Sequence, residues 1–155
     1  KKGVQTEFVT LHVGQGTFAP VKSDTVESHL MHAEWVDVDK VVAARLNAAK
    51  KQGKRIIAVG TTSLRTLEAM TDSSGKLTSG KKWVNIFIYP GYKFKFAGGL
   101  LTNFHLPKST LLMLVSALMS SAKKDEQIKD MKKIYQLAIK NKYRFYSFGD
   151  AMLIL

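Results

Sequence analysis

The strongest constraint on the fold is an alternation of short apolar segments and helical segments in the middle of the chain. Asp39 is a suitable helix N-cap, and the pattern predicts a helix from there up to a stop at Gly53. Arg55–Val59 is a compact apolar strand, and the turn Gly60-Thr61-Thr62 leads into a predicted helix over Ser63–Met70. Strands that alternate with helices predict an α/β fold.

The rest of the chain extends this pattern. Further strands are predicted over Phe8–Val13, Trp35–Val38, Trp83–Tyr89 and Arg144–Phe148, and further helices over Val26–Met31, Leu111–Met119 and Asp125–Asn141. Residues 71–81 read as a polar loop. We therefore expect a single α/β domain over residues 1–155, with a mixed, largely parallel sheet flanked by helices. Ligands of such sheets bind where strands turn into helices, here after Val13 and Val59.

Composition excludes several classes of protein. A chain of 155 residues with 45% apolar residues can bury a sizeable core, which a disordered chain cannot. It has no cysteine, which excludes a disulfide scaffold, a Cys-based zinc site and an iron–sulfur centre. The longest apolar stretch, Leu111–Met119, is far shorter than the roughly 20 residues of a membrane span. With no export signal recognised, we expect a cytoplasmic protein, and the absent initiator Met suggests a piece of a longer one.

The charge points to polyanionic partners. The chain has 24 Lys and Arg against 12 Asp and Glu, a formal net charge of +12. Such an excess attracts nucleic acid or an anionic membrane. Residues 40–55 and 80–96 contain lysines and no acid. The alternative is that these lysines only solvate the surface.

The first candidate ligand turn follows the predicted strand at Phe8–Val13. Gly14-Gln15-Gly16-Thr17-Phe18-Ala19 matches the G-x-G-x-x-A fingerprint of dinucleotide-binding domains, and Glu34 follows about 20 residues later. Pro20 interrupts the helix that would have to hold a pyrophosphate, which disfavours this interpretation. Gly14 and Gly16 more readily serve a sharp turn or the close approach of a ligand.

The second candidate turn follows the strand at Arg55–Val59. Thr61, Thr62 and Ser63 would place hydroxyl and backbone N–H groups at a helix start, with Arg65 one turn in, which suits an anion. The alternative is plain N-capping by Thr62 or Ser63, with Arg65 paired to Glu68. The two interpretations are compatible.

Two further segments carry polar or aromatic side chains. Asn103 and His105 stand in a constrained loop over Thr102–Pro107, where polar residues often mark a site. The cluster Tyr143–Met152 interleaves Arg144 with aromatic residues, which suits RNA bases and phosphates. Its alternative, which we favour, is a core strand with Arg144 paired to Asp150. The pair His29-x-x-His32 near Glu34 has a spacing open to metals, but such a pair alone rarely binds one, and we expect no metal.

These segments, taken in order, resemble the S-adenosylmethionine:tRNA ribosyltransferase-isomerase family. The resemblance spans essentially the whole chain but only the C-terminal part of the family's enzymes, and their inserted β-barrel domain has no counterpart here. The motifs that carry it are Leu11–Phe18, His29–Glu34, Val59–Glu68, Ile86–Gly91, Thr102–Leu111 and Tyr143–Met152.

The resemblance implies a step in queuosine biosynthesis. The family moves the ribosyl portion of S-adenosylmethionine onto 7-aminomethyl-7-deazaguanine in tRNA and isomerises it, which gives epoxyqueuosine-tRNA and releases adenine and methionine. S-adenosylmethionine is then a substrate, and no cofactor or metal is implied. The expected partner is the tRNA anticodon stem-loop, whose phosphates the positive charge would match. No membrane partner is expected.

We assign roles within the matched motifs on chemical grounds. A sulfonium makes its neighbouring C–H bonds acidic, so the reaction needs a base, and the departing adenine needs an acid. His105 and Asp150 are the candidate proton handlers, and Asn103 would orient a ribose hydroxyl. The turn of Thr61, Thr62, Ser63 and Arg65 would hold the methionine carboxylate or a phosphate.

Two other functions compete with this one. A non-catalytic basic RNA-binding module is the alternative, and this chain without the family's N-terminal region is expected to be inactive alone. A methyltransferase is disfavoured by Pro20 in the one glycine-rich loop.

Overall fold

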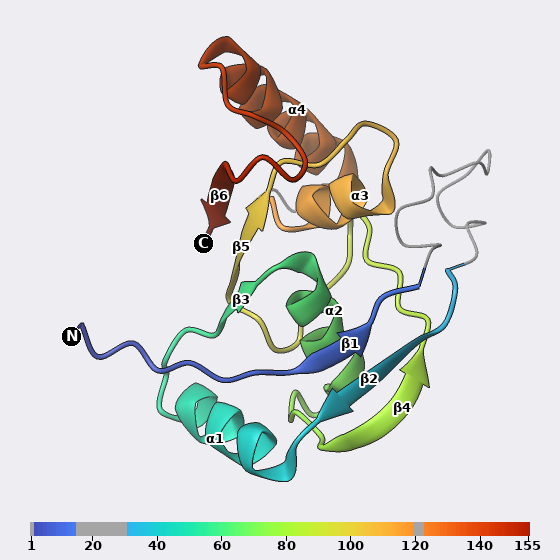
Figure 1. The fold of residues 1–155 in the computed structure, drawn as a ribbon, viewed down its shortest axis with the longest axis vertical. Coiled ribbons are helices and arrows are strands. Elements are labelled where there is room, and N and C mark those ends of the chain that lie inside the picture. Colours follow the sequence, from blue (N-terminus) through green and yellow to red (C-terminus); the bar gives the residue numbers. More distant parts are fainter. Residues whose placement is uncertain (1, 15–30, 120–122) are drawn as a thin grey trace.

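The computed structural model of the chain describes residues 2–14, 31–119 and 123–155. Its elements, in chain order, are strands and helices that alternate through the middle of the chain (Figure 1). They are β1 (Thr10–His12), β2 (Glu34–Val38), α1 (Lys40–Lys51), β3 (Ile57–Val59), α2 (Thr61–Met70), β4 (Gly80–Val84), β5 (Gly99–Asn103), α3 (Thr110–Ala117), α4 (Lys124–Lys140) and β6 (Ala151–Ile154).

The described strands form two three-stranded sheets. One has the order β1-β2-β4, and both of its pairs are antiparallel. The other has the order β3-β5-β6, in which β3 and β5 are parallel and β5 and β6 are antiparallel. The expected α/β class and mixed strand directions are confirmed. The expectation of largely parallel strands differs from the structure, since only β3 and β5 are parallel among the described pairs.

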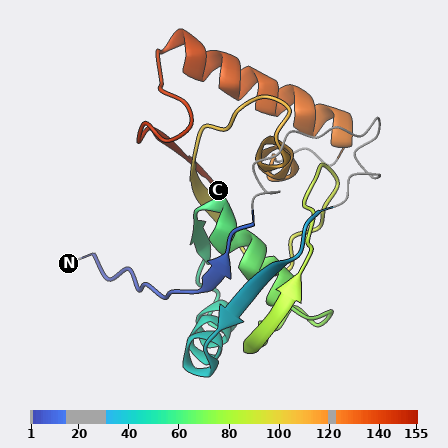
Figure 2. The same cartoon turned by 45° about the vertical axis from the view of Figure 1, so that its right-hand side comes forward.

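Helix α2 lies between the two sheets and carries the core (Figure 2). Its buried side chains include Leu64, Leu67 and Met70, and the core they join draws Val36 from one sheet and Leu100 from the other. A second apolar cluster forms where α3 and α4 pack together. The central helix therefore fixes the position of both sheets.

Several predicted elements are confirmed with shifted ends. Asp39 caps α1 as expected, because its carboxylate accepts hydrogen bonds from the N–H groups of Val41 and Val42, at 2.7 and 3.3 Å. Gly53, with φ of 72°, follows the helix as expected. The helix predicted over Val26–Met31 lies outside the described residues, except for Met31, which is not helical.

Strand β5 was not predicted from the sequence. The structure explains Gly99 by close approach: a Cβ there would lie 2.7 Å from the Ile154 carbonyl oxygen and 2.8 Å from Ile57. Glycine is thus required where the three strands meet.

The strand predicted over Arg144–Phe148 is wrong. This segment turns, with Tyr146 at a φ of 66°, and the last strand begins only at Ala151. Phe145 packs its ring against Phe104 and Tyr135, with centroids 5.3 and 5.7 Å apart. Phe145 therefore packs in the second apolar cluster rather than in a sheet, whereas Tyr146 and Phe148 are exposed.

Candidate functional site

The carboxyl ends of β3 and β5 form the edge at which candidate residues gather (Figure 1). The turn into α2 follows β3, and the loop with Asn103 and His105 follows β5. Strand β6 runs the other way, so Asp150 precedes it at the same edge, where Ala151 pairs with Asn103. The Gly60 N–H donates to the Leu101 carbonyl at 2.8 Å and ties the turn to β5. Three segments distant in sequence thus share one edge.

The turn into α2 is capped by backbone geometry rather than by a side chain. Gly60 occupies the N-cap position with a φ of 87°, and it makes no side-chain capping bond. The predicted capping by Thr62 or Ser63 is therefore wrong, because the helix begins earlier, at Thr61. Thr61 is buried, whereas Thr62 and Ser63 are half-buried. The N–H groups of a first helical turn have no acceptor within the helix, which makes this turn suitable for an anion.

A buried ion pair lies one turn further along α2. The Arg65 guanidinium pairs with the Glu34 carboxylate, and their side chains are 4% and 1% exposed. The other carboxylate oxygen of Glu34 accepts the Gly14 N–H at 3.0 Å. Gly14, Glu34 and Arg65 thus come together from three separate segments of the chain, while Gly16 lies outside the described residues.

The predicted pair between Arg65 and Glu68 does not form. Glu68 is fully buried, and its carboxylate accepts the backbone N–H groups of Lys95, Phe96 and Ala97 at 2.8, 3.0 and 3.0 Å. The two charged side chains of α2 therefore bind different neighbours. Arg65 pairs with Glu34 of β2, and Glu68 binds the backbone of the segment that leads into β5.

His105 is buried, with 4% of its surface exposed. Its Nε2 lies 3.1 Å from the Thr102 hydroxyl, and its backbone N–H donates to the Tyr135 hydroxyl at 3.1 Å. Burial lowers the pKa of His105 to about 4, so its imidazole is neutral at pH 7. The Thr102 hydroxyl also reaches the Asn103 side-chain oxygen at 3.4 Å. The Thr102 hydroxyl is the polar group in contact with Nε2 of the His105 imidazole.

Asp150 forms the ion pair with Arg144 that the sequence favoured. The guanidinium donates to both carboxylate oxygens, at 2.8 and 3.2 Å, and the Arg144 N–H donates at 2.6 Å. The hydrogen bonds from Arg144 lower the pKa of Asp150 to about 2. Asp150 is therefore ionised at neutral pH and accepts a proton poorly while the pair holds.

Asn103 joins this C-terminal turn to β5. Its side-chain amide donates to the Tyr146 carbonyl at 2.6 Å, and the Tyr146 N–H donates to the Phe104 carbonyl at 2.7 Å. The edge is thereby closed on one side by the Arg144–Asp150 turn. The sequence did not identify Glu34 as the partner of Arg65, or Thr102 and Tyr135 as the partners of His105. Glu34 could have been found, since it is two residues before Val36 on the same strand and so points to the same, inner face.

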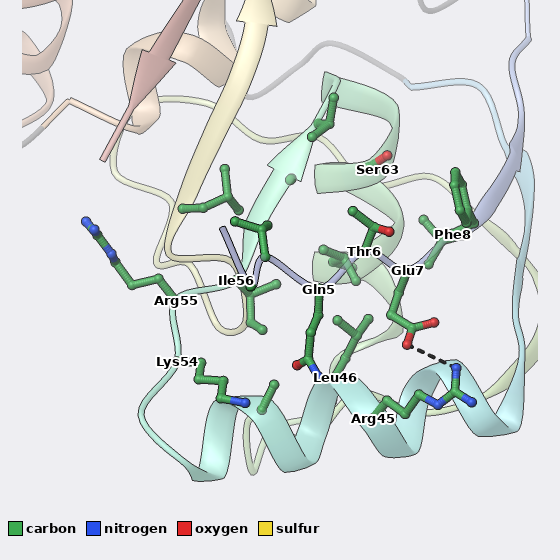
Figure 3. Close-up of a pocket in the computed structure, with 18 residues that line it drawn as sticks. Gln5, Thr6, Glu7, Phe8, Arg45, Leu46, Lys54, Arg55, Ile56 and Ser63 are labelled. Carbon is green, nitrogen blue, oxygen red and sulfur yellow. Dashed lines mark hydrogen bonds and ion pairs between the residues drawn. The ribbon is translucent and has the colours of Figure 1, made fainter. Parts of the chain in front are cut away.

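A groove of about 810 Å³ lies beside β3, and Figure 3 shows the residues that line it. Its walls are the extended residues 3–9, helix α1, β3 and the first turns of α2. Ser63 is the only predicted site residue among those that line it. Arg45 and Glu7 form an ion pair across it at 3.3 Å. The volume falls within the roughly 300–1,000 Å³ of small-molecule sites.

The basic runs are only partly available to a partner. The Lys50 ammonium donates to the Lys95 carbonyl and lies 4.6 Å from the centroid of the Phe96 ring. The Lys95 ammonium in turn donates to the Thr71 carbonyl. These two lysines stabilise the fold, whereas Lys51 and Lys54 are exposed.

Neither a metal cluster nor a membrane span is found in the described ranges. No group of three or more His, Cys, Asp or Glu side chains among residues 2–14, 31–119 and 123–155 could hold a metal ion. His29, one member of the His pair, lies outside these ranges. No helix in the same part of the chain is long and apolar enough to cross a membrane.

Comparison with known proteins identifies the family. A family described as queuosine biosynthesis protein matches residues 1–154. A relative from Caldanaerobacter subterraneus subsp. tengcongensis, named S-adenosylmethionine:tRNA ribosyltransferase-isomerase, is 54% identical over 99% of this chain and 43% of its own length. The crystal structure of S-adenosylmethionine tRNA ribosyltransferase from Thermotoga maritima matches with a TM-score of 0.65 and 43% identity, over 79% of this chain and 41% of that one. The chain thus spans less than half the length of these two relatives, and it belongs to the queuosine biosynthesis protein family.

Proposed function

We propose that this chain provides part of an S-adenosylmethionine:tRNA ribosyltransferase-isomerase. The observation that carries the proposal is the 54% identity with the Caldanaerobacter relative of that name, sustained over 99% of the chain. The gathering of the turn at Gly60, the loop at Asn103 and Asp150 at one sheet edge supports it, because such an edge is where α/β proteins bind ligands.

The proposed reaction moves the ribosyl portion of S-adenosylmethionine onto 7-aminomethyl-7-deazaguanine in the tRNA anticodon stem-loop. Isomerisation of the ribosyl unit gives epoxyqueuosine-tRNA, and adenine and methionine are released. S-adenosylmethionine is consumed as a substrate, so the proposal includes no cofactor and no metal. We place the reaction in the cytoplasm, where tRNA is modified.

The two proposed proton handlers take different roles. His105 is the proposed proton acceptor, because its imidazole is neutral at pH 7, and the Thr102 hydroxyl at its Nε2 is the proposed path for the proton. Burial lowers the pKa of His105 to about 4 and so makes it a weak base. Asp150 stays ionised, and its negative charge would stabilise the sulfonium rather than take a proton. The first turn of α2, with Thr61, Thr62 and Ser63, would bind the methionine carboxylate.

A chimera tests the proposal. Residues 1–154 would replace the matching segment of the Caldanaerobacter relative, and the chimera would be incubated with S-adenosylmethionine and precursor tRNA. We expect adenine release together with a ribosyl-derived mass gain of the tRNA, and no adenine release from the 155-residue chain alone. A folded chimera that binds tRNA without releasing adenine would contradict the proposal and favour the non-catalytic RNA-binding module. A gain of a single methyl group would identify a methyltransferase instead.

A further inference from the structure

The outer face of the sheet β1-β2-β4 carries a row of aromatic side chains. Buried Val36 and Val38 alternate along β2 with Trp35 and Asp37, which therefore point away from the core. Trp35 pairs in register with His12 of β1 and with Trp83 of β4, and paired residues of neighbouring strands point to the same face. We call His12, Trp35 and Trp83, with Thr10, Asp37 and Lys81 of the adjacent row, the aromatic face.

Trp83 is the most accessible ring of the aromatic face. It is 69% exposed, a large area for an apolar side chain to leave in water. Trp35 is half-buried, and the edge of His12 contacts it at a centroid distance of 5.0 Å and an interplanar angle of 75°. The chain has two tryptophans, and both stand on this face as direct neighbours across the strands. Trp35 is held from the side, and Trp83 offers its ring to a ligand.

A lysine lies beside these rings, paired with an aspartate. The Lys81 ammonium lies 5.7 Å from the centroid of the Trp35 ring and 3.7 Å from the Asp37 carboxylate, with 65% of its side chain exposed. Lys82, the next residue along β4, pairs in register with Val36 and so points to the opposite face, which leaves Lys81 as the cation beside these rings. An ion pair this exposed opens readily, so Lys81 can exchange Asp37 for a phosphate.

We propose that the aromatic face binds unpaired nucleotides of RNA, with a base stacked on Trp83 and the backbone phosphate held by Lys81. This deepens the proposed function, on which it rests for RNA as the substrate class. Exposed aromatic rings beside cations bind single-stranded nucleic acid because every base has a π-face and every nucleotide a phosphate. A protein partner fits less well, because Thr10, Asp37 and Lys81 in the adjacent row offer no apolar core for an interface.

The probe is a fluorescently labelled RNA hairpin with a loop of unpaired nucleotides, without S-adenosylmethionine. A fully paired duplex of equal charge is the control. We expect the hairpin, but not the duplex, to quench the intrinsic fluorescence of Trp35 and Trp83. Trp83→Ala should weaken hairpin binding about 5- to 150-fold at every salt concentration, the effect of losing one stacked base. Trp83→Phe, which keeps an aromatic ring, should restore most of the affinity.

The salt dependence of hairpin binding distinguishes the phosphate contact of Lys81 from base stacking on Trp83. Lys81→Gln should lower the slope of log affinity against log salt by about 0.7, whereas Trp83→Ala should leave the slope unchanged. Leu153→Ala, an exposed apolar residue on the other sheet, is the matched control and should bind like the wild type. Equal quenching by the duplex, or unchanged affinity of Trp83→Ala, would overturn the proposal. So would a blue-shifted emission that follows protein concentration and ignores RNA, which would make this face a contact between polypeptides.

These outcomes are independent of the test of the proposed function. A chimera that modifies tRNA while Trp83→Ala binds the hairpin normally would refute only the aromatic face. A wild-type chain that binds the hairpin through Trp83, in a chimera that releases no adenine, would refute only the reaction.

Discussion

Removing the charge of Glu34 should destabilise the fold strongly. Glu34→Gln is nearly isosteric and keeps an oxygen for the Gly14 N–H, but it leaves the Arg65 guanidinium buried without its carboxylate. Both side chains are almost wholly shielded from water, at 1% and 4% exposure, so solvent cannot replace the lost partner. Breaking a buried pair from one side costs about 3–5 kcal/mol. That is a large part of the roughly 5–15 kcal/mol of a typical domain.

Urea unfolding followed by circular dichroism measures this loss. The melting temperature should fall as well, by about 6–20 °C at roughly 2–4 °C per kcal/mol. Arg45→Met is the matched control: its pair with Glu7 is exposed, 66% on the arginine side, and its loss should cost about 0–1 kcal/mol. The double variant Glu34→Leu with Arg65→Met should lose less stability than Glu34→Gln, because neither charge of the pair remains buried. A loss for Glu34→Gln no larger than that for Arg45→Met would refute the reasoning.

The remaining predictions concern His105, Asp150 and Gly99. The pKa of His105 is near 4 in the folded protein and 6.5 in the unfolded chain. The free energy of unfolding should therefore fall by roughly 3 kcal/mol as the pH falls from 6.5 to 4. His105→Gln should remove this pH dependence in urea titrations. In the chimera, the same variant should lower the single-turnover rate by about 10²–10⁴-fold. Asp150, with its pKa lowered from 3.8 to about 2, should stabilise the protein above pH 4, and its advantage in melting temperature over Asp150→Asn should vanish as the pH falls towards 2. Gly99→Ala should destabilise by about 1–3 kcal/mol in urea unfolding, because its Cβ would clash with the Ile154 carbonyl. Gly98→Ala should be nearly neutral, because its Cβ would lie in ordinary contact, 3.8 Å from the Ile56 carbonyl oxygen.

Local signals predicted the helices well and the sheets less well. The Asp39 cap and Gly53 stop bound α1 because these signals act within one turn of the chain. The residues of β5 carry no such signal: Gly99 is there because β3 and β6 come close on both sides. That contact is set by partners distant in sequence, so periodicity could not have found it. The same limit explains why the strand predicted at Phe145 was wrong: the position of its ring is set by contacts with Phe104 and Tyr135, which are distant in sequence.

The sequence predicted which segments contain the candidate site residues, but not most of the side-chain pairs that these residues form. Sequence spacing offered Glu68 to Arg65 because they share a helix face. Sequence spacing could not identify Glu34 as the partner of Arg65, because Glu34 is 31 residues away and becomes a neighbour only when β2 packs against α2. The pair of Arg144 and Asp150 was predicted correctly, since it closes a short turn. Burial of His105 depends on Tyr135 of α4, and a single sequence carries no sign of that contact.

Helix α2 shows why buried charges matter for the site. The two described sheets share no backbone pairing, so packing of α2 between them must set their relation. Apolar contacts through Leu64 and Leu67 tolerate a small slide of the helix, because dispersion and burial have little directionality. Glu68 and Arg65 do not, since a slide would leave a carboxylate or a guanidinium buried without its hydrogen bonds. Two directional anchors on successive turns therefore fix where the first turn of α2 points. That turn is the proposed anion site. Substitution of Glu34 should therefore lower activity mainly by displacing the first turn of α2.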